Sequence, residues 1–281
     1  MNQETVTYLT NIVIGVILAL LATLYWRQQR GSNAMLYWVL AAWVMTVADI
    51  LFAARPLLSH TIGRLLPTLC VTAGHAVLLL GAQHTAGLAQ SWRKVSALIV
   101  VHAAGLVAFL VAGQPSNWRM VMNGLIWGGL SLASAWCLRR GSRHFWQSVA
   151  APASAFVAHA IFHGLRIVLA ILFEAQGWTG ATAWLQIVGD LEVSFFMVAL
   201  FVGLLVAHLQ LRHEELMSAQ AEVQTLSGLL PICAWCKKVR DDRGYWEQLE
   251  DYFSRRSQIR FTHGMCVDCV AQMRKTDSTP S

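Results

Sequence analysis

The sequence predicts an all-α membrane protein with seven transmembrane helices, followed by a helical linker and a small α+β cytosolic domain. Apolar residues make up 56% of the chain, and the mean hydropathy is +0.49. Charged residues make up 13%, about half of their usual share in soluble proteins. We therefore divide the chain into a membrane sensor domain (1–210), a coiled-coil-like linker (211–230), a four-cysteine domain (231–275) and a disordered tail (276–281).

Seven apolar stretches reach the length of about 20 residues that a transmembrane helix requires. They cover residues 8–26, 35–54, 65–87, 95–113, 120–138, 149–173 and 184–209. The chain starts without a basic segment, and no small-residue cleavage site follows the first stretch, so we expect no cleaved signal peptide.

Positive charges between these stretches predict the orientation. One set of alternate connections, with the residue after the last stretch, holds Arg27, Arg30, Arg93, Lys94, Arg139, Arg140, Arg143 and Arg212. The other set holds only Arg55, Arg64 and Arg119. The positive-inside rule therefore places the N-terminus outside and the C-terminus in the cytosol. The whole net charge of +6 belongs to residues 1–211, so the basic composition is no argument for nucleic-acid binding.

Charged residues inside the predicted helices lie at one depth. With a rise of about 1.5 Å per residue, Asp49, Arg166 and Asp190 fall about 8 to 11 Å below the outer surface. A charge in hydrocarbon costs about 2.5 to 3.5 kcal/mol on insertion scales, so we expect these three to face inward and compensate one another. Glu192 is expected to point to a different side of its helix.

Histidines add a second group of polar residues within the membrane. His159, His163 and Arg166 occupy positions i, i+4 and i+7, which places them in one stripe on a helix face. His75 and His102 lie near mid-depth of the third and fourth predicted helices.

Three interpretations of these polar groups stay open. The first is a structural clamp between arginine and aspartate, with the histidines satisfied by hydroxyl and carbonyl groups. The second is a ligand, proton or metal site opening outward, formed by Asp49, His75, His159, His163, Arg166 and Asp190. The third is a haem held between His75 and a histidine of residues 149–173.

A heptad pattern continues from the last apolar stretch into the linker. Val202, Leu209, Leu216, Val223 and Leu230 recur every seven residues, and no Gly or Pro interrupts residues 209–227. This pattern favours a parallel homodimer; the alternative is a single amphipathic helix against the C-terminal domain. Gly228 and Pro231 are expected to end the helix.

Four cysteines form two Cys-x-x-Cys pairs separated by 29 residues. The pairs are Cys233 with Cys236 and Cys266 with Cys269. Such spacing in a reducing compartment is typical of a tetrahedral zinc site, and His263 is a fifth candidate ligand. Iron-sulfur or redox chemistry is the alternative. A domain of about 45 residues buries too little surface to be stable alone, so the metal would supply stability, giving a zinc-ribbon-like fold.

Local patterns predict the elements between the pairs. Residues 241–244 have the composition of a turn. Trp246, Leu249 and Phe253 have helical spacing, and Ile259 and Phe261 alternate as in a short strand.

The segments 229–252 and 261–269, with their Cys-Ala-Trp-Cys and His-Gly-Met-Cys-Val-Asp-Cys runs, resemble a small zinc-finger-like module of bacterial signalling proteins. In that family the module follows PAS, GAF, receiver or histidine-kinase regions. The resemblance implies bacterial signal transduction at the inner membrane and matches the four cysteines and His263 to the family's recurrent Cys and His. Residues 1–210 look more loosely like the multi-helix sensor modules of diguanylate cyclases and histidine kinases.

These observations lead to one preferred function. Residues 212–281 leave no room for a cyclase, phosphodiesterase, kinase or receiver domain, so we expect binding rather than enzymatic output. The prediction is a sensor or signalling adaptor that contacts a cytosolic kinase, cyclase or regulator through its zinc module. A haem-binding or redox membrane protein and a small-solute transporter are the alternatives.

Overall fold

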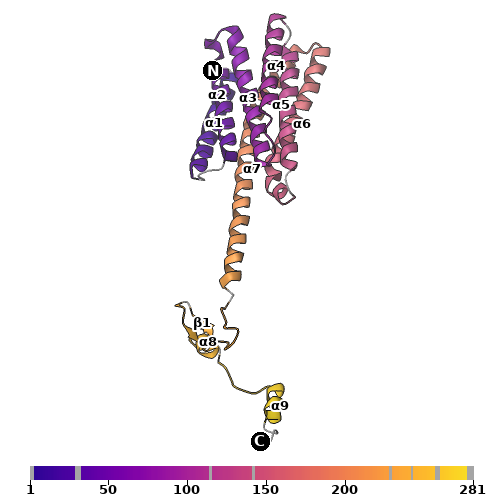
Figure 1. Ribbon diagram of the computed structural model, residues 1–281. Coiled ribbons are helices and arrows are strands. Elements are labelled where there is room, and N and C mark those ends of the chain that lie inside the picture. Colours follow the sequence, from indigo (N-terminus) through magenta and orange to yellow (C-terminus); the bar gives the residue numbers. More distant parts are fainter. Residues whose placement is uncertain are drawn as a thin grey trace. The chain divides into compact units, whose positions relative to one another are not determined.

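The computed structural model describes residues 3–28, 33–113, 116–140, 143–227, 230–241, 243–256 and 260–276. It divides the chain into two compact units, Met1–Glu214 and Glu215–Ser281. Each unit is described by itself below (Figure 1).

Seven long helices build the described part of the first unit, and α7 continues past Glu214. They are α1 (Gln3–Gln28), α2 (Asn33–Ala53), α3 (His60–Thr85), α4 (Trp92–Val111), α5 (Ser116–Arg139), α6 (Arg143–Ala175) and α7 (Thr179–Ser227). All seven are long and apolar enough to cross a membrane, and each overlaps one predicted span. The prediction of an all-α, multi-pass membrane protein is confirmed.

Glycine turns and a capping residue mark several ends of these helices. After α3 and α6, Gly87 and Gly177 adopt φ values of +69° and +67°, which only glycine reaches without strain. The next residue in each case donates back across the turn, as in the bond from Trp178 N to the carbonyl of Phe173 at 3.0 Å. A 3-10 turn, η1 (Arg55–Leu57), joins α2 to α3, and Ser59 caps α3 by accepting from the backbone N–H of Ile62.

Small residues allow the helices to approach closely. A Cβ on Gly203 of α7 would lie 2.9 Å from the backbone nitrogen of Pro152 in α6. Phe156 and Leu200 are completely buried in the same core. Apolar side chains also cover the outside of the bundle, for example Phe195 at 74% exposure, as expected for a surface that faces lipid.

Helix α7 runs for 49 residues without interruption. On its predicted heptad seam, Leu209 and Leu216 are 53% and 69% exposed. The side chains of Val223 and Leu226, and all of Gly228, lie outside the described residues.

Beyond the end of α7, the described part of the second unit contains a short hairpin and two helices. Strand β1 (Val239–Arg240) pairs antiparallel with β2 (Trp246–Glu247), and α8 (Leu249–Arg256) and α9 (Val267–Thr276) follow. Gly244 donates to the carbonyl of Asp241 at 3.0 Å, which agrees with the turn predicted there; Asp242 lies outside the described residues. Val239 is completely buried.

Two local predictions differ from the structure. Trp246 lies in β2 rather than in a helix, because the turn places it opposite Arg240 and the helix begins only at Leu249. Residues 260–266 contain no strand, since β1 pairs with β2 and is also bridged by Ile232. Ile259 lies outside the described residues. Two short strands do not establish a zinc-ribbon fold. Helix α9 ends at Thr276, and the other residues of the predicted tail, 277–281, lie outside the described residues.

Candidate functional site

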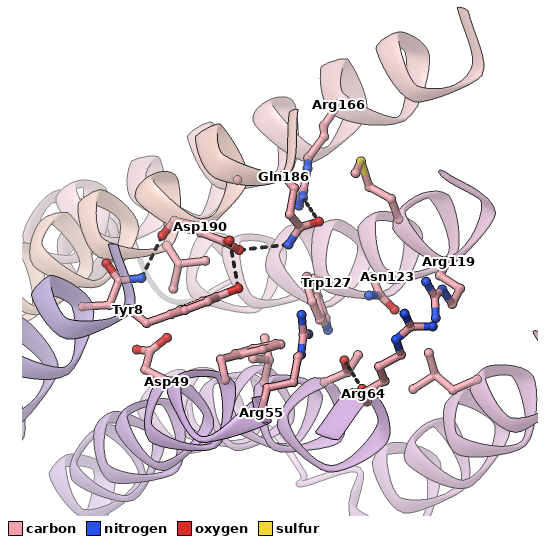
Figure 2. A pocket seen from close by; sticks show the side chains of 18 of the residues that line it. Tyr8, Asp49, Arg55, Arg64, Arg119, Asn123, Trp127, Arg166, Gln186 and Asp190 are labelled. Atoms are coloured by element: carbon pink, nitrogen blue, oxygen red, sulfur yellow. Dashed lines mark hydrogen bonds between the residues drawn. The ribbon is translucent and has the colours of Figure 1, made fainter. Parts of the chain in front are cut away.

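A polar cavity of about 350 Å³ lies between the helices at one end of the bundle (Figure 2). It is formed where α1, α3, α5 and α7 begin and where α2, α4 and α6 end. Its charged and polar lining consists of Tyr8, Asn11, Asp49, Arg55, Arg64, Thr68, Arg119, Asn123, Arg166, Gln186 and Asp190. The structure thus brings Asp49, Arg166 and Asp190, predicted at one depth, around a single space.

Three arginines approach the cavity from three elements. Arg55 comes from η1, Arg64 from the first turns of α3 and Arg119 from the start of α5. Arg119 lies close enough to the other two to experience their like charges, and Figure 2 shows Arg64 beside Arg119. Among the described residues, none of the three forms an ion pair with a carboxylate. Their convergence can bind an anionic group by charge-assisted hydrogen bonds.

Asp190 belongs to a hydrogen-bonded chain on another side of the cavity. Tyr8 Oη donates to Asp190 Oδ2 at 3.0 Å, and Gln186 Nε2 donates to Asp190 Oδ1, also at 3.0 Å. Gln186 Oε1 in turn accepts from Arg166 Nη2 at 3.2 Å. Arg166 and Asp190 are therefore linked through Gln186 rather than directly, as the dashed lines in Figure 2 show.

Histidines form a second polar chain deeper in the bundle. His75 Nδ1 lies 2.9 Å from the carbonyl oxygen of Val71, and His75 Nε2 lies 3.0 Å from His159 Nε2. His159 Nδ1 lies 2.8 Å from Glu192 Oε1. Both rings are buried and stack on Phe196. This chain joins α3, α6 and α7.

The directions of these hydrogen bonds determine how many protons the chain holds. The Val71 carbonyl only accepts, so His75 Nδ1 carries a proton. The two Nε2 atoms share a second proton. A third hydrogen, or a cation in its place, must lie between His159 Nδ1 and Glu192 Oε1, because two lone pairs at 2.8 Å repel. Two neutral imidazoles supply only two hydrogens, so the third is either the carboxyl hydrogen of a protonated Glu192 or is replaced by a cation.

His163 lies one helical turn beyond His159. It is 1% exposed, and neither of its ring nitrogens has a hydrogen-bond partner among the described residues. Its ring meets the rings of His159 and Trp127 edge to face. Glycines on α5 make room for it, since a Cβ on Gly128 would lie 3.3 Å from His163 Cβ.

His102 behaves as a structural histidine. Its Nδ1 lies 2.8 Å from Thr72 Oγ1 and its Nε2 lies 3.0 Å from Asn123 Oδ1. Both nitrogens are satisfied, so this residue ties α4 to α3 and α5.

The geometry around His75 does not fit a haem between it and α6. Two nitrogens on opposite sides of one metal stand about 4 Å apart, because each metal–nitrogen bond measures about 2.0 to 2.1 Å. His75 and His159 instead touch through nitrogens 3.0 Å apart, and Phe196 and Trp127 pack against the His75 ring.

The first cysteine pair lies in a tight turn of the second unit. Lys237 N donates to the carbonyl of Cys233 at 3.0 Å, and Cys233 N donates to the carbonyl of Lys238 at 2.8 Å. Lys237 has a φ of +59° and is the only described non-glycine residue with positive φ. This compact turn holds Cys236 close to Cys233, and Trp235 at its tip is 94% exposed.

The second pair lies at the start of α9, where Val270 N donates to the carbonyl of Cys266 at 3.1 Å. Both first cysteines have thiol pKa values below the ordinary one. For Cys233 the cause is chiefly the backbone N–H of Cys236, and for Cys266 the backbone N–H of Cys269. Such N–H groups stabilise thiolates, the form that binds zinc.

The four thiol groups and His263 do not form a common cluster in the described residues. Within the part of the chain that the structure describes, a group of three or more potential ligand atoms within 4.8 Å of one another occurs only at His159, His163 and Glu192. His263 is exposed in the irregular segment before Cys266. The zinc site therefore stays a prediction, to which the two thiolate-stabilising turns are suited.

Sequence reasoning missed several residues of the bundle sites. The loop charges place Arg55, Arg64 and Arg119 on one side of the membrane, which favours their proximity but does not assign them to a site. Glu192 does not line the cavity that Asp190 lines, as predicted from its position on another side of the helix, and it contacts His159 instead.

Comparisons with protein-family models, curated proteins and solved structures found no match.

Proposed function

We propose that the chain is a bacterial inner-membrane sensor or signalling adaptor. A small molecule with an acidic group binds in the bundle cavity, and the change reaches a zinc-binding cytosolic module that contacts a kinase, cyclase or regulator. The orientation is the predicted one, with the cavity open to the outside and the cysteines in the cytosol.

One observation carries this proposal: α7 contributes to the cavity and continues as one helix to Ser227, six residues before Cys233 in the sequence. Gln186 and Asp190 lie near its start. A ligand that competes for Asp190 or Arg166 would change the hydrogen bonds that hold α7 to α1 and α6. A displacement of the start of α7 would then move the rest of the same helix.

The ligand chemistry follows from the charges of the cavity. Three arginines that form no ion pair with a carboxylate among the described residues favour a carboxylate, sulfonate or phosphate group. Asp49 and Asp190 offer a place for an ammonium or hydroxyl group in the same molecule. A volume of about 350 Å³ suits a small metabolite rather than a peptide.

The C-terminal unit offers a surface for the partner. Trp235, Val267 and Tyr245 are 94%, 85% and 72% exposed. Exposed aromatic and aliphatic side chains of this size are typical of interaction sites. The resemblance of this unit to modules of bacterial signalling proteins supports the same interpretation.

Photo-crosslinking in living cells tests the proposal. A photoreactive amino acid at Trp235 should capture a cytosolic signalling protein, and Cys266→Ser should abolish the adduct. Arg119→Gln should change the amount of adduct several-fold, because it alters ligand binding in the cavity, which the start of α7 also lines. The matched control is the same probe at Leu57, which is 88% exposed in η1 and should capture no cytosolic protein. Adducts that ignore both substitutions, or cytosolic adducts from Leu57, would contradict the proposal.

A further inference from the structure

His159, His163 and Glu192 form a cluster of metal-ligand type within the bundle, separate from the cavity lining. The two histidines are at positions i and i+4 of α6, and Glu192 reaches them from α7. Their ligand atoms lie within 4.8 Å of one another. Two imidazoles and one carboxylate on packed helices form a donor set that binds divalent transition metals.

Unsatisfied polar atoms point to a missing partner in this cluster. Both ring nitrogens of His163 and the Oε2 atom of Glu192 are buried without a hydrogen bond. Such groups cost free energy unless something binds them. The rings of Trp127, Phe162 and His159 contact His163, and no described residue forms a hydrogen bond with either of its ring nitrogens.

The proton count identifies where a cation fits. A hydrogen or a cation is needed between His159 Nδ1 and Glu192 Oε1, which lie 2.8 Å apart. An ion bonded to both at about 2.1 Å would subtend an angle of about 85°, which is ordinary for metal coordination. The ion would replace the extra proton and reach toward the free nitrogens of His163.

We propose that His159 Nδ1, His163 and Glu192 bind one divalent first-row transition-metal ion. His159 Nε2–H then donates to His75 Nε2, and His75 Nδ1–H donates to the Val71 carbonyl. This outer chain fixes the His159 ring with Nδ1 free for the metal, as hydrogen-bonded outer residues do for metal-binding histidines. The site does not depend on the function proposed for the cavity or the cysteine module.

Cobalt titration of the full-length protein tests the proposal. The four cysteines of the C-terminal unit are first changed to serine, so that Co²⁺ cannot bind there. This variant should bind one equivalent of Co²⁺ with visible d–d bands and without the near-ultraviolet bands of thiolate ligands. His163→Ala and Glu192→Gln should each weaken binding more than 100-fold. His75→Phe should weaken it about 10- to 100-fold, the range for outer-chain residues.

Two controls make the result decisive. His213→Ala removes an exposed histidine of α7 and should leave Co²⁺ binding unchanged. Helical circular dichroism and a monodisperse elution profile show that each variant is folded; Glu192→Gln keeps the shape of the side chain and can still hydrogen-bond to His159. If the folded four-serine protein binds no Co²⁺, a hydrogen completes the contact between Glu192 and His159 and the proposal is wrong. Binding that persists in both His163→Ala and Glu192→Gln overturns it as well.

Discussion

The guanidinium group of Arg166 occupies the space that a side chain at position 189 would need. A Cβ on Gly189 would lie 2.6 Å from both Nη1 and Nη2 of Arg166. Glycine at this position of α7 thus allows an arginine of α6 to enter the bundle and to meet Gln186. The polar chain to Asp190 depends on this close approach.

Gly189→Ala should therefore disrupt the chain. The added methyl group displaces the guanidinium, and overpacking of this kind costs about 1 to 3 kcal/mol of unfolding free energy. The measurement is unfolding of the detergent-solubilised protein followed by tryptophan fluorescence. Gly164→Ala is the matched control, because a Cβ there meets no atom within 4 Å. Equal losses in the two variants would show that Arg166 does not fill this space.

Loss of Arg166 should be more damaging than loss of Arg119. Arg166→Ala leaves Gln186 without its donor inside the bundle, and an unsatisfied buried polar group costs about 1 to 3 kcal/mol. Arg119→Ala removes one of three like charges at the cavity and leaves no carboxylate unpaired. We expect a lower unfolding temperature for Arg166→Ala only. A comparable drop for Arg119→Ala would mean that the arginines are structural rather than available to a ligand.

Helix geometry explains which parts of these sites were predictable. A fixed rise per residue sets depth, so Asp49, Arg166 and Asp190 could be assigned to one level before any contact was known. The depth of a residue does not show which residues of other helices it contacts. Asp190 and Glu192 are two residues apart and about 200° apart around the helix, and only the packed bundle shows that one meets Tyr8 and the other His159.

The C-terminal unit was predicted less well for a different reason. Trp246 has the spacing of a helix with later residues, but short elements depend on their partners more than on periodicity. The turn at Asp241 and Gly244 closes a hairpin that pairs Trp246 with Arg240, so Trp246 lies in a strand despite its helical spacing. The cysteine spacing predicts a metal site but does not fix the path of the chain between the pairs.

The thiols of Cys233 and Cys266 should react at lower pH than an ordinary cysteine. Backbone N–H groups stabilise both thiolates and lower their pKa values. In metal-free protein, the pH dependence of iodoacetamide alkylation, read by mass spectrometry, should show midpoints below about 8.5, the value of a free cysteine. Because these pKa values are lower in the folded state, their contribution to stability is present at higher pH and is lost as the pH falls through them. Midpoints that do not change in urea would contradict the effect of the turns.

Removal of cysteine ligands should act on the C-terminal unit alone. Cys233→Ser with Cys266→Ser should abolish zinc binding and make residues 231–275 sensitive to protease, because the metal is expected to supply the stability of so small a unit. Membrane insertion should be unchanged. Zinc content by elemental analysis and limited proteolysis of inverted vesicles measure both effects. Cys70→Ser, within α3, is the control that should retain zinc. A wild-type protein with no zinc would contradict the metal assignment.

The exposed seam of α7 predicts a parallel dimer. Leu209 and Leu216 are one heptad apart, and both are exposed in the single chain. In a four-serine background, Leu216→Cys should form intermolecular disulfides under mild oxidation of membrane vesicles. Ser218→Cys is the control, because two residues turn the side chain about 200° away from the seam. We expect several-fold more dimer from position 216. Similar yields at 216 and 218 would instead favour the alternative in which α7 lies against its own C-terminal unit, since random collisions do not distinguish the two faces of a helix.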